Sequence, residues 1–169
     1  PGQLAFEACQ IEINRLNKFS GKQDQYASAY GGVNKFIFSK NDEVKIVPLS
    51  ISTKNLNNFF SRIRLVWTNI QRDSSKVAKS YKFTDKKSDK PKLLQETVND
   101  FQKLFEMKKL DYEKLSNVIQ RTWILKKKFS KSISPKNINN LSRKLNNIKI
   151  NGHRLVGAGA GGFFLCLLK

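Results

Sequence analysis

The chain has 169 residues and a formal net charge of +19 at pH 7, and 39% of its residues are hydrophobic. This length and apolar content suffice for an ordinary domain with a core, which excludes wholesale disorder. No apolar run reaches the roughly 18 to 20 residues that a membrane-spanning helix needs. The amino end begins directly in a helical pattern, so no signal peptide is predicted either.

The excess of positive charge favours anionic partners and leaves a basic nucleic-acid-binding module as one interpretation. However, Lys, Asn, Ile, Ser and Phe are abundant together, and a biased coding composition enriches all five without selection for charge. The lysine run at residues 126–128 is expected to be a solvated face. The sequence has no RNP-like strand, zinc-finger spacing or obvious helix-turn-helix. Cys9 and Cys166 lack metal-type spacing, which indicates a reducing, cytoplasmic compartment.

Residues 4–17 are predicted to form a helix, because small and apolar residues recur on one face at three- and four-residue intervals. That stripe consists of Ala5, Ala8, Cys9, Glu12 and Leu16. Burying an unpaired carboxylate among such neighbours is costly, so two interpretations of Glu12 are open. Either Glu12 lies at the edge of the stripe, paired with Arg15 or reaching water, or it is a metal ligand whose small neighbours leave room for the ion.

A second, short helix is predicted after a capping box, in which Ser20 is the cap and a glutamine follows three residues later. This helix is expected to end at Gly31 and Gly32. Asp24 lies in its first turn, where the helix dipole favours a carboxylate without any functional role. A turn of this kind can also hold an aspartate against the hydroxyl of a small molecule.

The remaining elements follow from hydrophobic periodicity. Strands are predicted at residues 33–39, 43–49 and 62–68. Helices are predicted at residues 53–60, 93–107 and 112–129, from Ser134 onward, and in a basic segment that ends near Phe83. Residues 84–91 are charged and lack apolar spacing, which predicts an exposed loop.

The end of the chain is predicted to be a strand, a glycine-rich turn and a second strand. Residues 157–162 spell Gly-Ala-Gly-Ala-Gly-Gly, which removes more side chains than a hairpin turn requires. The missing Cβ atoms allow backbone N–H groups to approach an anion or another loop. No Gly-Lys-Ser/Thr and no helix follow, which excludes a Walker loop and a dinucleotide fingerprint. His153, beside this turn, is expected at the surface.

Three separated segments resemble one family when they are taken together. They are residues 21–26 with Gly31-Gly32, residues 65–68 with Arg72, and residues 155–163. In this order they resemble the carboxyl-terminal part of a GHMP-type kinase, a family that includes galactokinases, mevalonate kinases and homoserine kinases. Within the family, the likeness is to sugar kinases that act on D-glycero-D-manno-heptose 7-phosphate. The last segment resembles the family's third motif, with Ala160 where glycine is usual.

The resemblance implies a role for each matching position. Asp24 matches the aspartate that accepts the proton of the sugar hydroxyl. Glu12 lies twelve residues earlier, and galactokinase-like members of the family keep a magnesium-binding glutamate at that distance before the aspartate. The implied substrate-binding residues are Gly21, Gln25, Gly31, Gly32 and Arg72, of which Arg72 suits a phosphorylated sugar. The third-motif loop comprises Gly157, Ala158, Gly159, Ala160, Gly161 and Gly162, and it is expected to pack against the phosphate-binding loop.

The resemblance also implies an α+β fold in two parts. Residues 1–50 are expected to be the remainder of a nucleotide-binding amino-terminal domain, and residues 51–169 a ferredoxin-like helix-and-strand carboxyl-terminal domain. The family's Gly-Leu-Gly-Ser-Ser-type ATP loop is absent from the sequence, so a fragment that is inactive alone is expected.

The implied activity of the parent enzyme is phosphorylation of a sugar phosphate with ATP and Mg²⁺. The expected acceptor is the anomeric hydroxyl of D-glycero-D-manno-heptose 7-phosphate, for the synthesis of cell-surface polysaccharide. Kinases of fucose, galactose or arabinose type are the alternative within the family, and the nucleic-acid-binding module is the alternative outside it. No membrane partner is expected.

Overall fold

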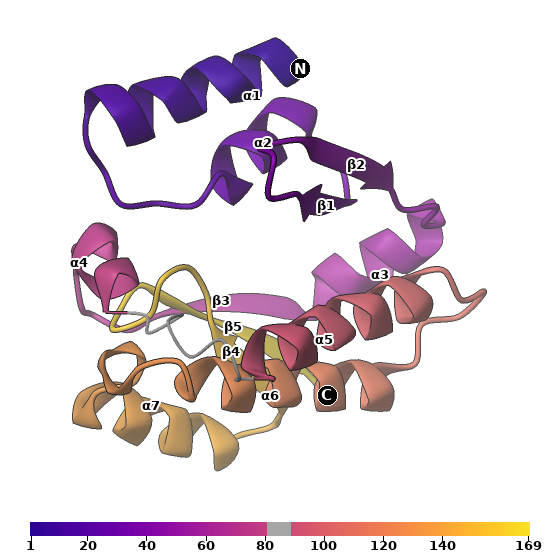
Figure 1. Cartoon of the computed structure of the whole chain (residues 1–169). Coiled ribbons are helices and arrows are strands. Elements are labelled where there is room, and N and C mark those ends of the chain that lie inside the picture. The colour runs from indigo at the N-terminus through magenta and orange to yellow at the C-terminus, as the bar shows by residue number, and fades with distance from the viewer. Residues whose placement is uncertain (81–88) are drawn as a thin grey trace. The chain divides into compact units, whose positions relative to one another are not determined.

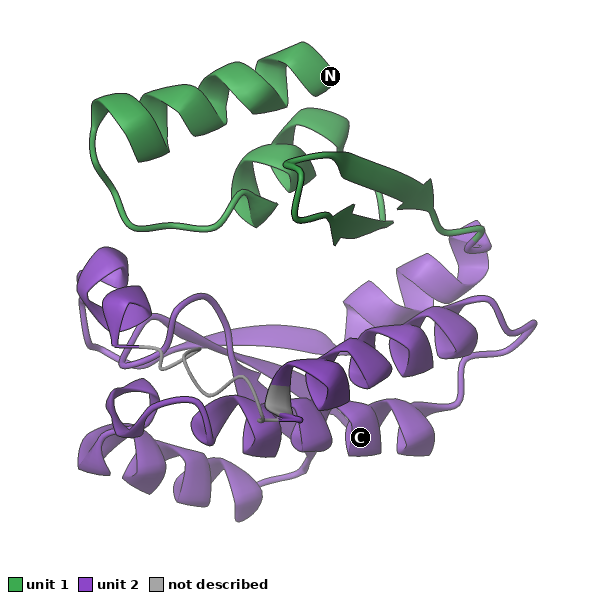
Figure 2. Ribbon diagram, in the orientation of Figure 1, with its two compact units in different colours: residues 1–50 green, residues 51–169 purple. Residues whose placement is uncertain are grey.

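The computed structural model describes residues 1–80 and 89–169, which form two compact units, Pro1–Ser50 and Ile51–Lys169 (Figure 1 and Figure 2). Both units mix helices and strands, so the predicted α+β class is confirmed. No helix in these ranges is long and apolar enough to span a membrane. The predicted helix end at Phe83 and residues 84–88 of the predicted loop lie outside the described residues, whereas the end of that predicted loop, Lys90 and Pro91, is wrong because both residues begin a helix.

Unit 1 consists of helices followed by a β-hairpin. Its elements are α1 (Gly2–Cys9), a π-helical turn η1 (Gln10–Arg15), α2 (Gln23–Tyr30), β1 (Asn34–Phe38) and β2 (Val44–Pro48). The two strands pair antiparallel, with Asn34 opposite Pro48, as the sequence predicts. Ala5, Cys9 and Tyr26 form the buried core of this unit.

The π-helical turn changes which residues of the first helix face the core. The N–H of Leu16 donates to the carbonyl oxygen of Ile11 at 2.9 Å, a five-residue step that widens the helix locally. The predicted 3.6-residue stripe therefore fails after Cys9. Leu16, expected on the inner face, is 59% exposed, and Ile13 packs against the core.

Helix α2 begins without the predicted capping box. Its N-cap is Lys22, and no side chain caps the helix. The Ser20 Oγ is buried and has no hydrogen-bond partner among the described residues. The helix ends as predicted at Gly31, whose φ of 61° and ψ of −170° are essentially restricted to glycine.

Unit 2 is built around a three-stranded antiparallel sheet in the order β3-β5-β4. Its elements are α3 (Thr53–Arg62), β3 (Ile63–Trp67), α4 (Ser74–Lys79), α5 (Lys90–Phe105), α6 (Tyr112–Lys127), a 3₁₀ turn η2 (Lys131–Ile133), α7 (Lys136–Asn146), β4 (Ile150–Leu155) and β5 (Phe163–Leu168). The glycine-rich turn connects β4 to β5. Because β5 is the central strand, β3 pairs with it on the side opposite to β4.

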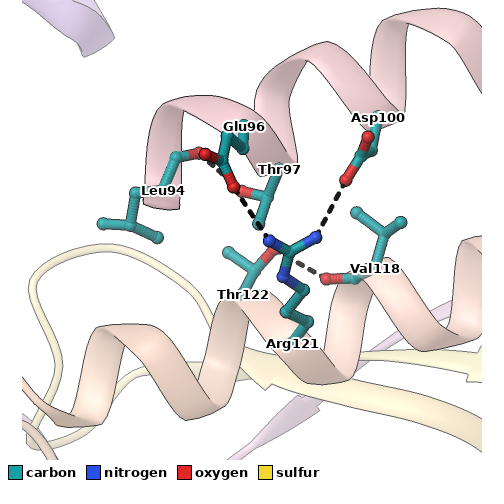
Figure 3. Close-up of polar contacts among 7 residues, drawn as sticks. All are labelled: Leu94, Glu96, Thr97, Asp100, Val118, Arg121 and Thr122. Carbon is teal, nitrogen blue, oxygen red and sulfur yellow. Dashed lines mark hydrogen bonds and ion pairs between the residues drawn. The ribbon is translucent and has the colours of Figure 1, made fainter. Parts of the chain in front are cut away.

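Buried side chains and surface ion pairs both join the helices of unit 2. One buried cluster contains Trp123, Phe129, Ile133, Ile138, Leu145, Leu155, Phe164 and Cys166. A second contains Leu104, Phe105, Leu110, Leu115, Ile119 and Leu167. On the outside, Arg121 of α6 donates to Asp100 Oδ2 at 3.2 Å and to Glu96 Oε2 at 3.1 Å, both on α5 (Figure 3).

His153 is buried, so its predicted surface position is wrong. It is 1% exposed, and its Nε2 lies 2.7 Å from Ser142 Oγ. The Trp123 Nε1–H donates to the same hydroxyl oxygen at 3.3 Å. Alternation along β4 turns His153 and Leu155 to the same side of the strand, and both are buried. Burial lowers the pKa of His153, with a smaller effect from Lys127.

Candidate active site

Glu12, Asp24 and Gln25 line one pocket of unit 1, with a volume of about 360 Å³. Glu12 comes from η1, and the other two come from α2. The rest of the lining is small or apolar and consists of Leu4, Ala8, Ser28 and Ala29. The structure thus brings together the two acidic residues that the sequence singles out.

Two side chains hold the Glu12 carboxylate. The amide Nε2 of Gln25 donates to Glu12 Oε2, and Lys18 Nζ lies 3.5 Å from Glu12 Oε1. Lys18, rather than the expected Arg15, is therefore the cationic neighbour of Glu12. The π-helical turn that carries Glu12 is a rare structure that occurs frequently at functional sites, and nothing in the sequence pattern indicated it.

The oxygen atoms at this position fit a magnesium ion. Gln25 Oε1 is buried and lacks a hydrogen-bond partner among the described residues. Its orientation follows from the bond to Glu12, because a carboxylate only accepts and the amide nitrogen must face it. Mg²⁺ prefers such oxygen donors and usually binds one or two carboxylates together with water and substrate phosphates. The described residues contain no cluster of three His, Cys, Asp or Glu side chains. A magnesium ion at this position would therefore need water or substrate phosphates as further ligands.

Asp24 is exposed and lies in the first turn of α2. The helix dipole stabilises its negative charge there. A carboxylate at the rim of a pocket can accept a proton from a hydroxyl group bound in that pocket. The sequence alone explains Asp24 as a helix-start residue, whereas the pocket shared with Glu12 favours a functional role.

The other positions for which the resemblance implies substrate contacts lie elsewhere. Gly21 lines a second pocket of unit 1, of about 560 Å³. Gly31 and Gly32 have φ values of +61° and +64°, and a Cβ added at either would have no heavy atom within 4 Å, so the turn after α2 explains them. Arg72 and residues 157–162 belong to unit 2.

Arg72 and the glycine-rich loop meet in unit 2. Arg72 Nη1 donates to the carbonyl oxygen of Gly161, and Nη2 lies 3.5 Å from that of Val156. A Cβ atom added at Gly157 would overlap Arg72 Nη2, and one added at Gly162 would overlap Nη1. The φ values of +70° at Gly157 and +87° at Gly162 favour glycine at both positions, and the guanidinium group lies in the space that a side chain would enter.

Backbone contacts fix the rest of this loop. The N–H and Oγ1–H of Thr68 donate to the carbonyl oxygen of Gly162 at 2.9 and 2.8 Å. The N–H of Ala160 donates to the carbonyl oxygen of Ile133 at 2.8 Å. Ala160 has a φ of +62°, a conformation that costs a residue with a Cβ roughly 1 kcal/mol. The loop therefore holds its shape through contacts with two distant segments.

Lys126 is a second cation at the loop that the sequence did not reveal. Its Nζ donates to the carbonyl oxygen of Gly157 and lies 3.4 Å from that of Leu155. Burial lowers the pKa of Lys126 to about 7, with contributions from Arg154 and Arg72. The lysine run at residues 126–128 suggested a solvated face, but Lys126 follows the buried Trp123 by three positions. That helical spacing was the available signal.

Solved structures of kinases share this fold. A D-glycero-D-manno-heptose 1-phosphate kinase from Bacteroides thetaiotaomicron is 21% identical, with a TM-score of 0.64, and the match covers 97% of this chain and 43% of that one. The mevalonate kinase of L. major, solved with R-mevalonate, is 18% identical, with a TM-score of 0.65, and the match covers 88% of this chain and 45% of that one. At these identities the likeness concerns the fold.

A curated sugar kinase matches the sequence itself. The chain is 30% identical over 166 residues to the D-glycero-alpha-D-manno-heptose 7-phosphate kinase of Campylobacter jejuni subsp. jejuni serotype O:2. The resemblance to a heptose-phosphate kinase is confirmed by this match. The match covers 95% of this chain but 48% of the curated protein, so the chain spans about half the length of that relative. No family model matches the sequence.

Proposed function

We propose that the protein containing this chain transfers the γ-phosphoryl group of ATP to a hydroxyl group of a sugar phosphate. The observation that carries the proposal is the pocket of unit 1 lined by both Glu12 and Asp24. The curated relative is named for heptose 7-phosphate, which supports the anomeric hydroxyl of D-glycero-D-manno-heptose 7-phosphate as the acceptor. Because the chain spans half of that relative, we propose the activity for the complete gene product. Both substrates are phosphorylated metabolites, which supports a cytoplasmic enzyme.

Asp24 is the proposed catalytic base. Phosphoryl transfer depends mainly on positioning and charge neutralisation. In the proposed step, Asp24 accepts the proton of the sugar hydroxyl while the hydroxyl oxygen bonds to the γ-phosphorus and the bond to the β,γ-bridging oxygen breaks. The products are the sugar phosphate ester and ADP. The position of Asp24 at a pocket rim, beside a second carboxylate, supports this role.

Glu12 and Gln25 are the proposed magnesium-binding residues. The Glu12 carboxylate and the unpartnered Gln25 Oε1 supply oxygen donors from two adjacent helices. When bound, Mg²⁺ neutralises charge on the phosphate oxygens. The hydrogen bond from Gln25 to Glu12 Oε2 orients the carboxylate, and Lys18 contacts its other oxygen, Oε1.

A substrate panel tests the proposal. The complete gene product is incubated with ATP, Mg²⁺ and either D-glycero-D-manno-heptose 7-phosphate or the unphosphorylated sugars fucose, galactose and arabinose. We expect a kcat/KM for the phosphorylated acceptor that is higher by about 100-fold or more, since a site that pairs a phosphate strongly rejects an analogue without it. Equal turnover of the unphosphorylated sugars would assign the alternative acceptors. Salt-sensitive nucleic-acid binding without any sugar phosphorylation would replace the kinase with the basic binding module.

A further inference from the structure

Three cations gather at the glycine-rich loop of unit 2. Arg72 and Lys126 donate hydrogen bonds to loop carbonyl oxygens, at Gly161 and Gly157 respectively. Arg154 lies in β4 and, like Arg72, is close enough to Lys126 to lower its pKa through charge repulsion. Two positive side chains therefore contact the loop, and a third lies near Lys126.

Two of these cations, Lys126 and Arg154, have no carboxylate partner among the described residues. The cations of the ion pairs found there are Lys18, Lys22, Lys114 and Arg121. The Arg154 Nε is buried and has no hydrogen-bond partner in the same ranges. A buried donor without an acceptor destabilises the folded chain, and like charges at close range add repulsion in a partly buried setting. An anion that accepts hydrogen bonds from these groups would remove both costs.

We propose that Arg72, Lys126 and Arg154 form a binding site for a phosphate group at the glycine-rich loop. A phosphate dianion matches this site because its oxygens can accept hydrogen bonds from several cationic donors at once. The exposed Gly157 leaves the edge of the loop open to solvent. Two sources share this chemistry, namely the ester phosphate of a sugar phosphate and the phosphates of a nucleotide. Phosphate binding at this site does not depend on the proposed function. Only the assignment of the phosphate to a sugar phosphate or to a nucleotide rests on it.

Lys126 makes the binding observable through protons. With a pKa of about 7, its amine is mostly neutral at pH 8.5. A bound dianion favours the charged ammonium group and raises the pKa of Lys126. Both arginines remain charged throughout this range. Phosphate binding at pH 8.5 should therefore take up close to one proton, and Lys126 is its acceptor.

Calorimetric titration of the 169-residue chain with inorganic phosphate tests the site. Titrations at pH 8.5 in two buffers of different ionisation enthalpy give the number of protons taken up. We expect Lys126→Met to weaken binding about tenfold or more and to abolish the proton uptake. The matched control is Lys128→Met, which removes the same charge from an exposed neighbour and should change the dissociation constant by less than about twofold.

Two outcomes would overturn the site. Equal losses in Lys126→Met and Lys128→Met would indicate an adventitious ion only, attracted by net charge. Binding without proton uptake in the unmodified chain would remove Lys126 as a ligand. If Lys126→Met does not fold, NMR titration of the Lys126 side chain with and without phosphate decides, since an unchanged pKa contradicts the proposal.

Competition identifies the source of the phosphate. Displacement of inorganic phosphate by a sugar phosphate, but not by ADP or by the unphosphorylated sugar, assigns the site to the acceptor. Displacement by ADP assigns it to the nucleotide, and displacement by neither overturns a role in the proposed reaction. These titrations involve no turnover, so an inactive kinase does not affect them. Conversely, unchanged KM values for both substrates in an active Lys126→Met enzyme would reject the site and leave the proposed kinase in place.

Discussion

The pocket of unit 1 and the glycine-rich loop of unit 2 are opposite in charge and in construction. Glu12 and Asp24 line the pocket from neighbouring helices, so a short stretch of sequence builds it. The loop depends on the hydrogen bond between Arg72 and Gly161, which lie 89 positions apart, and on the formation of the three-stranded sheet. Changes at the pocket should therefore alter chemistry with little effect on folding, whereas changes at the loop should alter stability first.

Asp24→Asn provides the largest expected effect and tests the chemical side of this comparison. In the complete gene product, kcat should fall by about 10²–10⁴, because a general base contributes that much, while KM for the acceptor should change little. The free energy of unfolding should stay nearly constant, since Asp24 is exposed. Steady-state kinetics and urea unfolding measure both. Glu7→Gln, which removes the same charge from an exposed site on α1, is the control, and normal turnover of Asp24→Asn would exclude Asp24 as the base.

Gly159→Ala tests the structural side. Its φ is +114°, and the new Cβ would lie 3.0 Å from the Cα and 3.1 Å from the carbonyl oxygen of Ile133, so strain and overpacking against backbone should destabilise the chain by roughly 2–4 kcal/mol. Gly32→Ala is the matched control in unit 1, because its φ is +64° but nothing lies within 4 Å of the added atom. That change should cost only about 1 kcal/mol. Equal losses in urea unfolding would mean that the loop is not packed against the backbone of Ile133.

The sequence predicted the elements of both regions better than the contacts within them. Hydrophobic periodicity located the hairpin of unit 1 and the strands around the glycine-rich turn, because alternation and turn residues are local signals. It failed at Leu16, where a π-helical turn interrupts the 3.6-residue repeat, and at Ser20, whose side chain does not cap α2. Backbone hydrogen bonds decide both features, and composition does not specify them.

In the candidate site, too, the sequence indicated single residues but not the contacts between them. Asp24 and Glu12 could be selected by their resemblance to a kinase motif, and the helical stripe predicted that Glu12 has small neighbours. The role of Gln25 in orienting Glu12, and the approach of Lys126 to Gly157, depend on which helices and strands pack together. Such contacts between segments leave no periodic signal in a single sequence.

The pH dependence of stability separates Lys126 from ordinary surface lysines. Burial and two arginines lower its folded-state pKa to about 7, against an ordinary value of 10.5. Between these values the unfolded chain binds more protons than the folded chain, so the contribution of Lys126 to stability rises with pH. The slope is at most about 1.4 kcal/mol per pH unit, and we expect a gain of roughly 1–2 kcal/mol from pH 7 to 8.5. Urea unfolding of Lys126→Met should lack this gain, whereas Lys128→Met should retain it.

The smallest expected effect comes from Arg121, which lies on the same helix as Lys126 but has two carboxylate partners (Figure 3). Its side chain is 46% exposed, so Arg121→Gln should cost only about 0.5 kcal/mol, as surface ion pairs do.

Salt should change the effects of Arg121 and Lys126 on stability in opposite directions. Screening weakens the attraction between Arg121 and its carboxylates, and it relieves the repulsion between Lys126 and the arginines. Unfolding measured at pH 6 in low and high sodium chloride should therefore show the cost of Arg121→Gln decreasing with salt, whereas the stability of Lys126→Met relative to the unmodified chain should fall with salt. The same salt response in both variants would mean that Lys126 is as exposed and as well paired as Arg121, and that the loop of unit 2 carries no excess positive charge.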